Sequence, residues 1–236
     1  DAAKRASADK IIAIVPYFGF ARQDRKDRPR VPIASKLVAD LLTAAGISRL
    51  ITLDLHADQI QGFFNVPVDH LYSSKVFLPV VRGLGLDNMM FASPDVGGTR
   101  RAAAYAKAFG TDFAICYKQR SRPNVIASMS LIGAVKGKNV ILLDDMIDTA
   151  GTITKAAQLI MDEGALSVRA IAAHAVLSGS AYEKIENSAF TKVYVTDTIP
   201  LRQQSDKIEV VSTAPIFAEA VRKIQKHESV SSLFEL

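Results

Sequence analysis

From residue 140 to residue 152 the chain reads Val140-Ile141-Leu142-Leu143-Asp144-Asp145-Met146-Ile147-Asp148-Thr149-Ala150-Gly151-Thr152. The apolar residues at its start predict a buried strand over Val140–Leu143. Asp144 and Asp145 follow at the carboxyl end of this strand, on opposite faces. A turn of small and hydroxylated residues then leads into a helix predicted over Thr152–Glu163. This order indicates an α/β fold, in which ligands bind beside the carboxyl ends of the strands.

The turn after this strand has the composition of a phosphate-binding site. Small residues let backbone N–H groups approach a phosphate, and the helix amino terminus adds unpaired donors. Carboxylates just upstream suit ribose hydroxyls or a hydrated Mg²⁺ ion. The alternative is that Asp148 or Thr149 only caps the helix, a task that needs one such residue. The candidate sugar-phosphate residues are Asp144, Asp145, Asp148, Thr149, Ala150, Gly151 and Thr152.

Strand-like and helix-like segments alternate along the chain. Apolar runs predict strands, and periodic segments closed by glycine, as at Gly46, predict helices. The alternation calls for a mostly parallel α/β sheet with crossover helices. Strands are predicted over 11–15, 50–55, 88–92, 112–117, 140–143, 168–173 and 192–196, and helices over 1–8, 32–45, 98–109, 152–163 and 215–236.

A weak internal repeat favours two related α/β domains. The spacing from Gly46 to His56 recurs from Gly164 to His174, with histidine ten positions after glycine in both copies. Similar helix–strand units converge by chance, so this repeat alone does not establish a duplication. The domain boundary is predicted near Leu71–Val81.

Composition places the chain among folded globular proteins. It has 236 residues, of which 49% are apolar and 22% are charged. No apolar run approaches the ~18–20 residues that a membrane-spanning helix needs, and no signal-like leader is visible. The single cysteine, Cys116, lies in an apolar strand and is interpreted as a core residue. We expect a cytoplasmic protein without a membrane partner.

A basic cluster follows the first predicted strand. It attracts phosphate, whether that phosphate belongs to a nucleotide or to nucleic acid. No nucleic-acid motif accompanies it, and a solvated basic loop explains the charge equally simply, so no nucleic-acid partner is expected. The cluster consists of Arg22, Arg25, Lys26, Arg28, Arg30 and Lys36, with Asp24 and Asp27 between them.

The stretch Asp144–Thr152 resembles the phosphoribosyl pyrophosphate-binding motif of the type I phosphoribosyltransferase fold. Three further motifs extend the resemblance, over nearly the whole chain, to the class I ribose-phosphate pyrophosphokinases, or phosphoribosyl pyrophosphate synthetases. A phosphoribosyltransferase would share Asp144–Thr152 but not these three. They are Tyr17-Phe18-Gly19-Phe20-Ala21-Arg22-Gln23-Asp24-Arg25-Lys26-Asp27, Asp54-Leu55-His56-Ala57-Asp58-Gln59-Ile60-Gln61-Gly62-Phe63-Phe64 and Ser93-Pro94-Asp95-Val96-Gly97-Gly98.

The resemblance implies two tandem type I phosphoribosyltransferase-like domains with mostly parallel sheets, the first one truncated. Residues 1–72 match the remainder of the N-terminal, ATP-side domain, and residues 73–214 match the C-terminal, ribose 5-phosphate-side domain. Residues 215–236 match a closing helix that packs back on the N-terminal domain. Because the family begins upstream of Asp1, its opening strands and an adenine-contacting loop are expected to be missing. ATP binding is then the step most affected.

The activity implied by the resemblance is Mg²⁺-dependent transfer of the pyrophosphoryl group of ATP to the 1-hydroxyl of ribose 5-phosphate. The products are phosphoribosyl pyrophosphate, used in nucleotide biosynthesis, and AMP. Mg²⁺ is the implied cofactor, and ATP and ribose 5-phosphate are the implied ligands. The family forms hexamers built from dimers, and phosphate and ADP are the implied allosteric ligands.

The resemblance also implies roles for individual residues. The residues at ATP-binding positions are Arg22, Gln23, Asp27 and His56. The residues at metal-binding positions are Asp54, His56 and Asp95, of which Asp95 also matches a ribose 5-phosphate position beside Asp144–Thr152. The residues at catalytic positions are Lys118 and Arg120, in a flexible loop that closes over the transferred group. The residues near the allosteric site are Ser229, Ser231 and Phe234.

Simpler interpretations stand beside these roles. Asp54 and His56, two positions apart on a predicted strand, project from one face and could hold a divalent ion, yet strand histidines are more often structural, as at His174. Asp95 could cap the helix that follows it. The basic segment that begins at Lys118 could be an ordinary exposed loop.

Three functions compete on these observations. A pyrophosphokinase needs both the ATP-side and the ribose-side residues. A phosphoribosyltransferase that consumes phosphoribosyl pyrophosphate leaves Asp54, His56, Arg22 and Gln23 without a use. A non-catalytic or truncated regulatory member of the pyrophosphokinase family would retain binding without turnover, although Lys118 and the other family residues are present.

Overall fold

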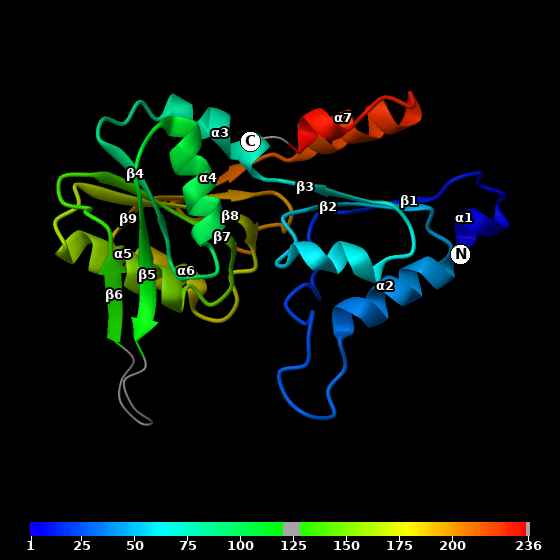
Figure 1. Ribbon diagram of the computed structural model, residues 1–236, viewed down its shortest axis with the longest axis horizontal. Coiled ribbons are helices and arrows are strands. Elements are labelled where there is room, and N and C mark those ends of the chain that lie inside the picture. Colours follow the sequence, from blue (N-terminus) through cyan, green and yellow to red (C-terminus); the bar gives the residue numbers. More distant parts are fainter. Residues whose placement is uncertain (120–127, 235–236) are drawn as a thin grey trace. The chain divides into compact units, whose positions relative to one another are not determined.

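Strands and helices alternate through the chain, as the sequence predicts. The computed structural model describes residues 1–119 and 128–234, and for Lys118, Gln119 and Ser128 it describes the backbone alone (Figure 1). The chain divides into two units, each described by itself below. The first holds Asp1–Ser73 and the C-terminal helix, and the second holds Ser74–Thr213.

The second unit is built on a twisted sheet whose described strands run in the order β10-β9-β8-β7-β4-β5-β6. The strands pair in parallel except β5 with β6, which are antiparallel. The strands are β4 (Met89–Ser93), β5 (Phe113–Gln119), β6 (Ser128–Ile132), β7 (Asn139–Ile147), β8 (Ser167–Ala175), β9 (Phe190–Thr196) and β10 (Ile208–Val211).

Helices cover both faces of this sheet (Figure 1). On one face, α3 (Ser74–Gly83) and α4 (Thr99–Phe109) bury aromatic and aliphatic side chains against Phe91, Ile141 and Leu143. On the other face, α5 (Gly151–Asp162) and α6 (Ala181–Glu186) pack on alternate residues of the same central strands. Because β7 and β8 lie in the middle of the sheet and are covered on both faces, their central residues, Val140–Leu143 and Ala170–Ala173, are all apolar and buried.

The first unit contains a smaller parallel sheet in the order β1-β2-β3. Its core is formed with helix α2 (Ala34–Ala45). Gly46 caps this helix with φ +105°, and its N–H donates to the carbonyl oxygens of Leu42 and Thr43. In Figure 1, α7 lies on the side of this sheet opposite α2. The elements are α1 (Ala2–Arg5), β1 (Ile12–Val15), α2 (Ala34–Ala45), β2 (Arg49–Leu53), the 3₁₀ helix η1 (Asp58–Phe63), β3 (Val68–Leu71), α7 (Ala214–Gln225) and the 3₁₀ helix η2 (Ser231–Leu233).

The predicted α/β architecture with mostly parallel sheets is confirmed, and some predicted boundaries are wrong. The strand predicted over Val140–Leu143 continues to Ile147, because β8 pairs with it as far as Ala175. In α2, Leu37 and Leu41 have helical spacing yet are 53% and 60% exposed, so smaller residues face the core. Among the described residues, no helix combines the length and apolarity that crossing a membrane requires.

Candidate functional site

The turn after β7 has the backbone of an anion-binding site. Asp148 and Thr149 leave the strand, and Ala150 takes the left-handed conformation at φ +59° immediately before α5. The backbone N–H and the hydroxyl of Thr154 both donate to the Ala150 carbonyl oxygen, at 3.1 and 2.8 Å. These bonds start the helix, so the N–H groups of its first residues point outward from the turn.

A second segment, after the carboxyl end of β8, holds this turn in place. The backbone N–H groups of Leu177 and Ser178 donate to the carbonyls of Ile147 and Asp148, both at 3.0 Å. The Ser178 hydroxyl donates to Oδ1 of Asp148, and Lys184 Nζ of α6 donates to the carbonyl oxygen of Thr149 at 3.0 Å. Hydrogen bonds to its backbone carbonyls and to the Asp148 side chain therefore hold this turn in place.

Asp144 and Asp145 are the last acidic pair before the turn. Asp145 is buried, and its backbone N–H donates to Oδ1 of Asp144 at 2.9 Å. Burial raises the pKa of the Asp144 carboxyl well above its usual range, the negative charge of Asp145 raises it further, and the Arg101 guanidinium opposes both. A carboxyl pair in this state favours ligands that bring hydrogen-bond donors or positive charge.

The loop after β4 forms a tight turn around Asp95. Oδ1 of Asp95 accepts a hydrogen bond from the N–H of Gly98 at 3.1 Å, and the Ser93 hydroxyl donates to the Asp95 carbonyl at 2.5 Å. A Cβ at Gly98 would lie 2.5 Å from Ser93 Oγ and 3.5 Å from the Leu143 carbonyl oxygen, so a larger residue there would force Ser93 to move. The capping interpretation of Asp95 is thus compatible with a ligand role, since its carboxylate remains exposed.

In the first unit, Asp54 does not lie as the sequence predicts. The strand ends at Leu53, and Asp54 has φ +40° and is 4% exposed. Its Oδ1 accepts from the N–H of Ser73 at 3.0 Å and its Oδ2 from the Ser73 hydroxyl, which ties the end of β2 to the end of β3. The prediction that Asp54 and His56 project from one strand face is wrong, because Asp54 is buried and His56 is exposed.

A buried histidine lies beneath the segment that carries His56. Nε2 of His70 accepts a hydrogen bond from the N–H of Leu55 at 2.8 Å, so this nitrogen is the unprotonated one. Nδ1 faces the Asp58 carboxylate at 3.6 Å and the Gln61 amide at 3.5 Å. His70 therefore fixes the backbone that presents His56, although no sequence motif singled it out.

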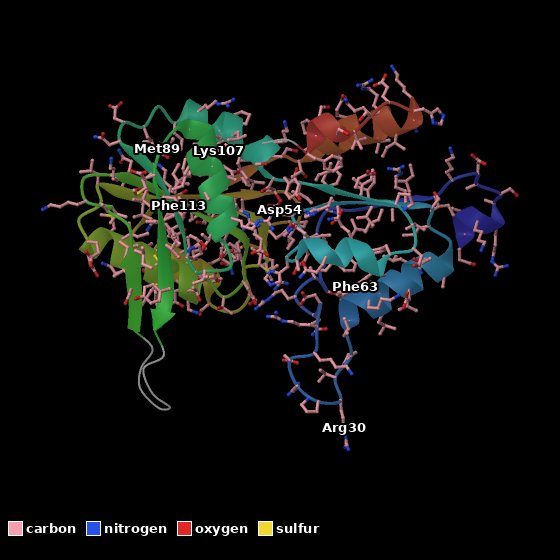
Figure 2. The ribbon with its side chains drawn as sticks, viewed as in Figure 1. Arg30, Asp54, Phe63, Met89, Lys107 and Phe113 are labelled. Atoms are coloured by element: carbon pink, nitrogen blue, oxygen red, sulfur yellow. The ribbon has the colours of Figure 1, made fainter. Side chains whose placement is uncertain are left out.

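The basic cluster lies on the long loop between β1 and α2, except for Lys36, which lies in the first turn of α2. Arg22, Gln23 and Asp27 are exposed, and the backbone of Gln23 is held by bonds to Phe20 and from Ser35. Arg30 lies near the tip of this loop and points away from the sheet (Figure 2). The loop is anchored at its base and presents its charges to solvent, so it can receive a phosphate-rich ligand.

The remaining predicted residues are only partly described. The backbone of Lys118 lies in β5, while Arg120 falls outside the described residues. Near the C terminus, the Ser229 hydroxyl donates to Ser231 Oγ at 2.9 Å, and Phe234 follows η2. Within the described ranges, no group of three His, Cys, Asp or Glu side chains converges in the manner of a metal site.

Comparison with known proteins assigns the family. A model of the phosphoribosyl synthetase-associated domain matches residues 114–235, and a model of the N-terminal domain of ribose phosphate pyrophosphokinase matches residues 1–46. The ribose-phosphate pyrophosphokinase of Porphyromonas gingivalis is 55% identical over 99% of this chain and 75% of its own length. The chain belongs to the ribose-phosphate pyrophosphokinase family. The Wolinella succinogenes enzyme of this name is 56% identical over 99% of this chain and 76% of its own length.

A solved structure extends the family assignment to the fold. The phosphoribosylpyrophosphate synthetase of Mycobacterium smegmatis matches with a TM-score of 0.88 and 41% identity, over 96% of this chain and 75% of that one. The resemblance inferred from the sequence motifs is therefore confirmed, as is the α/β fold with phosphoribosyltransferase-like domains. The roles of individual residues and the assignment of each domain to one substrate stay predictions.

Several residues that support the candidate site belong to none of the motifs in the sequence. Ser73, Ser178 and Lys184 each donate a hydrogen bond to a predicted residue, and the charge of Arg101 lowers the pKa of Asp144. One signal was available for Ser178, since it follows a predicted parallel strand whose carboxyl end must lie at the same sheet edge as Asp148. Arg101 and Lys184 lie on helices, and their contacts depend on helix placement that no motif encodes.

Proposed function

We propose that this chain synthesises phosphoribosyl pyrophosphate from ATP and ribose 5-phosphate, with release of AMP. Family membership, with the names of its relatives, supports the reaction. The observation that carries the proposal within this chain is the turn Asp148–Gly151, which Ser178 and Lys184 hold by hydrogen bonds and which follows shortly after the Asp144–Asp145 pair. That combination suits a ligand with a phosphate at one end and hydroxyls nearby.

Ribose 5-phosphate binds to the second unit in this proposal. The N–H groups of the turn and of the first residues of α5 bind the 5-phosphate, which the helix amino terminus favours. Asp144 and Asp145 accept hydrogen bonds from the ribose hydroxyls, which offsets part of the cost of burying two carboxylates together. Asp95, exposed at the end of the neighbouring strand β4, contributes from the adjacent loop.

ATP binds to the first unit in this proposal. Arg22 is suited to phosphate because its planar guanidinium can donate two parallel hydrogen bonds. Gln23 and Asp27 lie on the same loop and supply polar contacts to the nucleoside. His56 is exposed on the segment that His70 and η1 hold, where it can approach the phosphates.

In the chemical step, the 1-hydroxyl oxygen of ribose 5-phosphate bonds to the β-phosphorus of ATP. The bond from that phosphorus to the oxygen bridging the α- and β-phosphates breaks, AMP leaves with this oxygen, and the hydroxyl proton passes to solvent. Lys118 and Arg120 neutralise the charge that develops on the transferred group. No covalent intermediate on the protein is required, so catalysis consists of positioning and electrostatic stabilisation.

Mg²⁺ fits the donors that the chain offers. A protein-bound Mg²⁺ keeps several waters and typically needs one or two carboxylates in addition to substrate phosphates, so a three-residue cluster is unnecessary. Within the described part of the chain, Oδ2 of Asp95 accepts no hydrogen bond, which leaves a hard oxygen exposed. In the second unit Asp95 would hold an ion, and in the first unit His56 would do so beside the ATP phosphates. Mg²⁺ would supply charge neutralisation on the phosphates. Asp54 is the weaker candidate, because Ser73 engages both of its oxygens.

The wider setting of the activity is also part of the proposal. We place the enzyme in the cytoplasm, where its substrates occur, and expect a homo-oligomer of the hexameric family type. Phosphate and ADP are the proposed allosteric ligands near Ser229, Ser231 and Phe234. Sedimentation of the purified chain with and without phosphate tests the assembly, and a sedimentation coefficient of a monomer under both conditions would contradict it.

The proposed activity is tested by measuring AMP after the purified chain is incubated with ATP, Mg²⁺ and ribose 5-phosphate. AMP should form only when all three are present, and EDTA should abolish it. Lys118→Ala should lower kcat far more than it raises either KM, whereas Asp148→Asn should mainly weaken ribose 5-phosphate binding. Binding of ribose 5-phosphate without AMP formation would instead favour the non-catalytic member of the family.

A further inference from the structure

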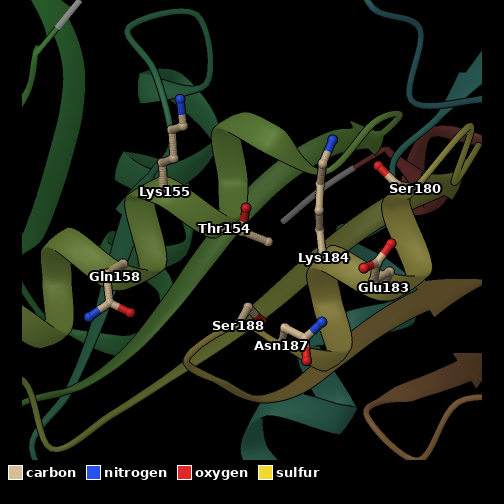
Figure 3. Close-up of a pocket in the computed structure, with 8 residues that line it drawn as sticks. All are labelled: Thr154, Lys155, Gln158, Ser180, Glu183, Lys184, Asn187 and Ser188. Atoms are coloured by element: carbon tan, nitrogen blue, oxygen red, sulfur yellow. The ribbon is translucent and has the colours of Figure 1, made fainter.

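A cavity of about 470 Å³ lies between α5 and α6 (Figure 3). Two lysines, Lys155 and Lys184, rise along it from different helices. The residues that line it, drawn in Figure 3, are all of polar or charged type: Thr154, Lys155, Gln158, Ser180, Glu183, Lys184, Asn187 and Ser188.

Several polar groups of this cavity already bond within the protein. The Thr154 hydroxyl donates to Ala150 O at 2.8 Å, the Gln158 amide donates to Asp162 at 2.8 Å, and the Ser188 hydroxyl donates to Ile185 O at 2.6 Å. These hydrogen bonds hold three of the lining side chains against the protein. Lys184 differs from these groups, because its side chain leaves the cavity lining and bonds to the turn Asp148–Gly151.

Lys184 extends from a fixed base to a single backbone atom of the turn. In α6, the neighbouring residues Ala181, Tyr182 and Ile185 are buried in the core, so the helix cannot shift without disturbing the packing. The Tyr182 hydroxyl also accepts a hydrogen bond from the N–H of Arg202 at 3.0 Å. From this base, Lys184 Nζ donates to the Thr149 carbonyl oxygen at 3.0 Å.

The bond to Thr149 has a consequence on the opposite side of the turn. The peptide between Thr149 and Ala150 is trans, so its carbonyl and its N–H point in opposite directions. A carbonyl fixed toward the cavity therefore directs the Ala150 N–H away from it, to the side where a phosphate would bind. Ala150 needs this support, because at φ +59° an alanine is strained by about 1 kcal/mol, which a flip of the peptide would relieve.

We propose that Lys184 is a positioning residue for ribose 5-phosphate, which holds the Thr149–Ala150 peptide so that the Ala150 N–H faces the 5-phosphate. The inference rests on the proposed function, which puts the 5-phosphate at this turn. Lys184 acts through the peptide and makes no contact with substrate. Helix α6 and the aliphatic stem of Lys184 hold its ammonium group in place. The ammonium group in turn holds the Thr149–Ala150 peptide through its hydrogen bond to the Thr149 carbonyl oxygen.

The test compares three variants in the full chain by calorimetric titration with ribose 5-phosphate and by steady-state kinetics. Lys184→Met removes the donor and keeps the aliphatic stem, and Lys184→Arg keeps a donor. Lys155→Met is the matched control, since it removes the same charge from the same cavity without a bond to the turn. Thermal unfolding of each variant reports whether the fold itself has changed.

Lys184→Met should raise the Kd and the KM for ribose 5-phosphate about three- to tenfold, the effect of one hydrogen bond, while the KM for ATP stays the same. Lys184→Arg should recover most of this loss, and Lys155→Met should match the parent chain. The inference is overturned if Lys184→Met matches Lys155→Met, or if ATP and ribose 5-phosphate are affected equally. A parent chain that does not bind ribose 5-phosphate at all would refute the proposed site together with the inference.

Discussion

The Asp144→Asn variant should be more stable than the parent chain while binding ribose 5-phosphate less well. Burial and the neighbouring Asp145 charge raise the pKa of the Asp144 carboxyl, so the ionised form destabilises the fold at neutral pH. Asparagine removes that charge, and its amide oxygen can still accept the hydrogen bond from the Asp145 N–H. Loss of the attraction to Arg101 offsets part of the gain.

The size of the effect follows from these opposing contributions. Removal of the buried charge raises the free energy of unfolding and loss of the attraction to Arg101 lowers it, so we expect a net gain of about 1–2 kcal/mol, within the range that single stabilising substitutions commonly give. For a chain of this length that gain corresponds to a rise in Tm of about 2–8 °C. The exposed carboxylate Asp112 is the control, and Asp112→Asn should leave the free energy of unfolding within about 0.5 kcal/mol of the parent.

The pH dependence identifies the cause of the gain. A carboxyl whose folded-state pKa is raised stabilises the fold fully below its unfolded pKa of about 3.9, and this stabilisation is lost as the pH rises through the folded-state pKa. The gain of Asp144→Asn over the parent, measured by thermal unfolding in EDTA without ligand, should therefore be small near pH 4 and larger at pH 8. A gain that does not change with pH, or a loss of stability at pH 8, would refute the electrostatic cause.

Two further perturbations test the structural roles of predicted residues. Asp54→Ala should lower the free energy of unfolding by about 2–3 kcal/mol in the absence of ligand, because the Ser73 N–H and hydroxyl lose their acceptor. Urea unfolding measures this loss. Unchanged stability together with weaker metal or ATP binding would show that Asp54 is a ligand-binding residue instead. Gly98→Ala should cost about 1–3 kcal/mol because its Cβ would meet Ser93 Oγ, and Ser93→Ala in the same chain should recover part of this loss. In the same measurement Gly83→Ala, where a Cβ meets nothing within 4 Å, should cost much less, and equal costs would show that the close contact is not the cause.

Much of the fold was predictable because its central strands are buried on both faces. Strands β7 and β8 are apolar runs followed by turns, a pattern typical of the central strands of a parallel sheet. Short or partly exposed elements were harder to predict: α6 has only six residues, and β6 pairs at the sheet edge with β5 alone. Such elements exist because their neighbours position them, and their own sequences carry weak periodicity.

The candidate site was predicted correctly in position at the Asp144–Thr152 motif. The prediction was wrong at Asp54, where the backbone conformation determines how the side chain lies. Asp144–Thr152 lies at the carboxyl end of a central strand, as parallel topology requires. The pairing of Asp54 with His56 assumed that a strand continues past Leu53, whereas a left-handed residue at Asp54 ends it. Supporting contacts such as that of Lys184 join segments distant in the sequence, so only the folded chain reveals them.

The central claim, that this chain transfers a pyrophosphoryl group, is tested most directly by ³¹P NMR of ATP, Mg²⁺ and ribose 5-phosphate with the purified chain. Consumption of ATP should give AMP and a ribose 1-diphosphate signal in equal amounts, with the 5-phosphate signal retained and no ADP. Appearance of ADP would indicate transfer of a single phosphoryl group and contradict the claim. Unchanged ATP, under conditions where ribose 5-phosphate binds, would contradict it as well.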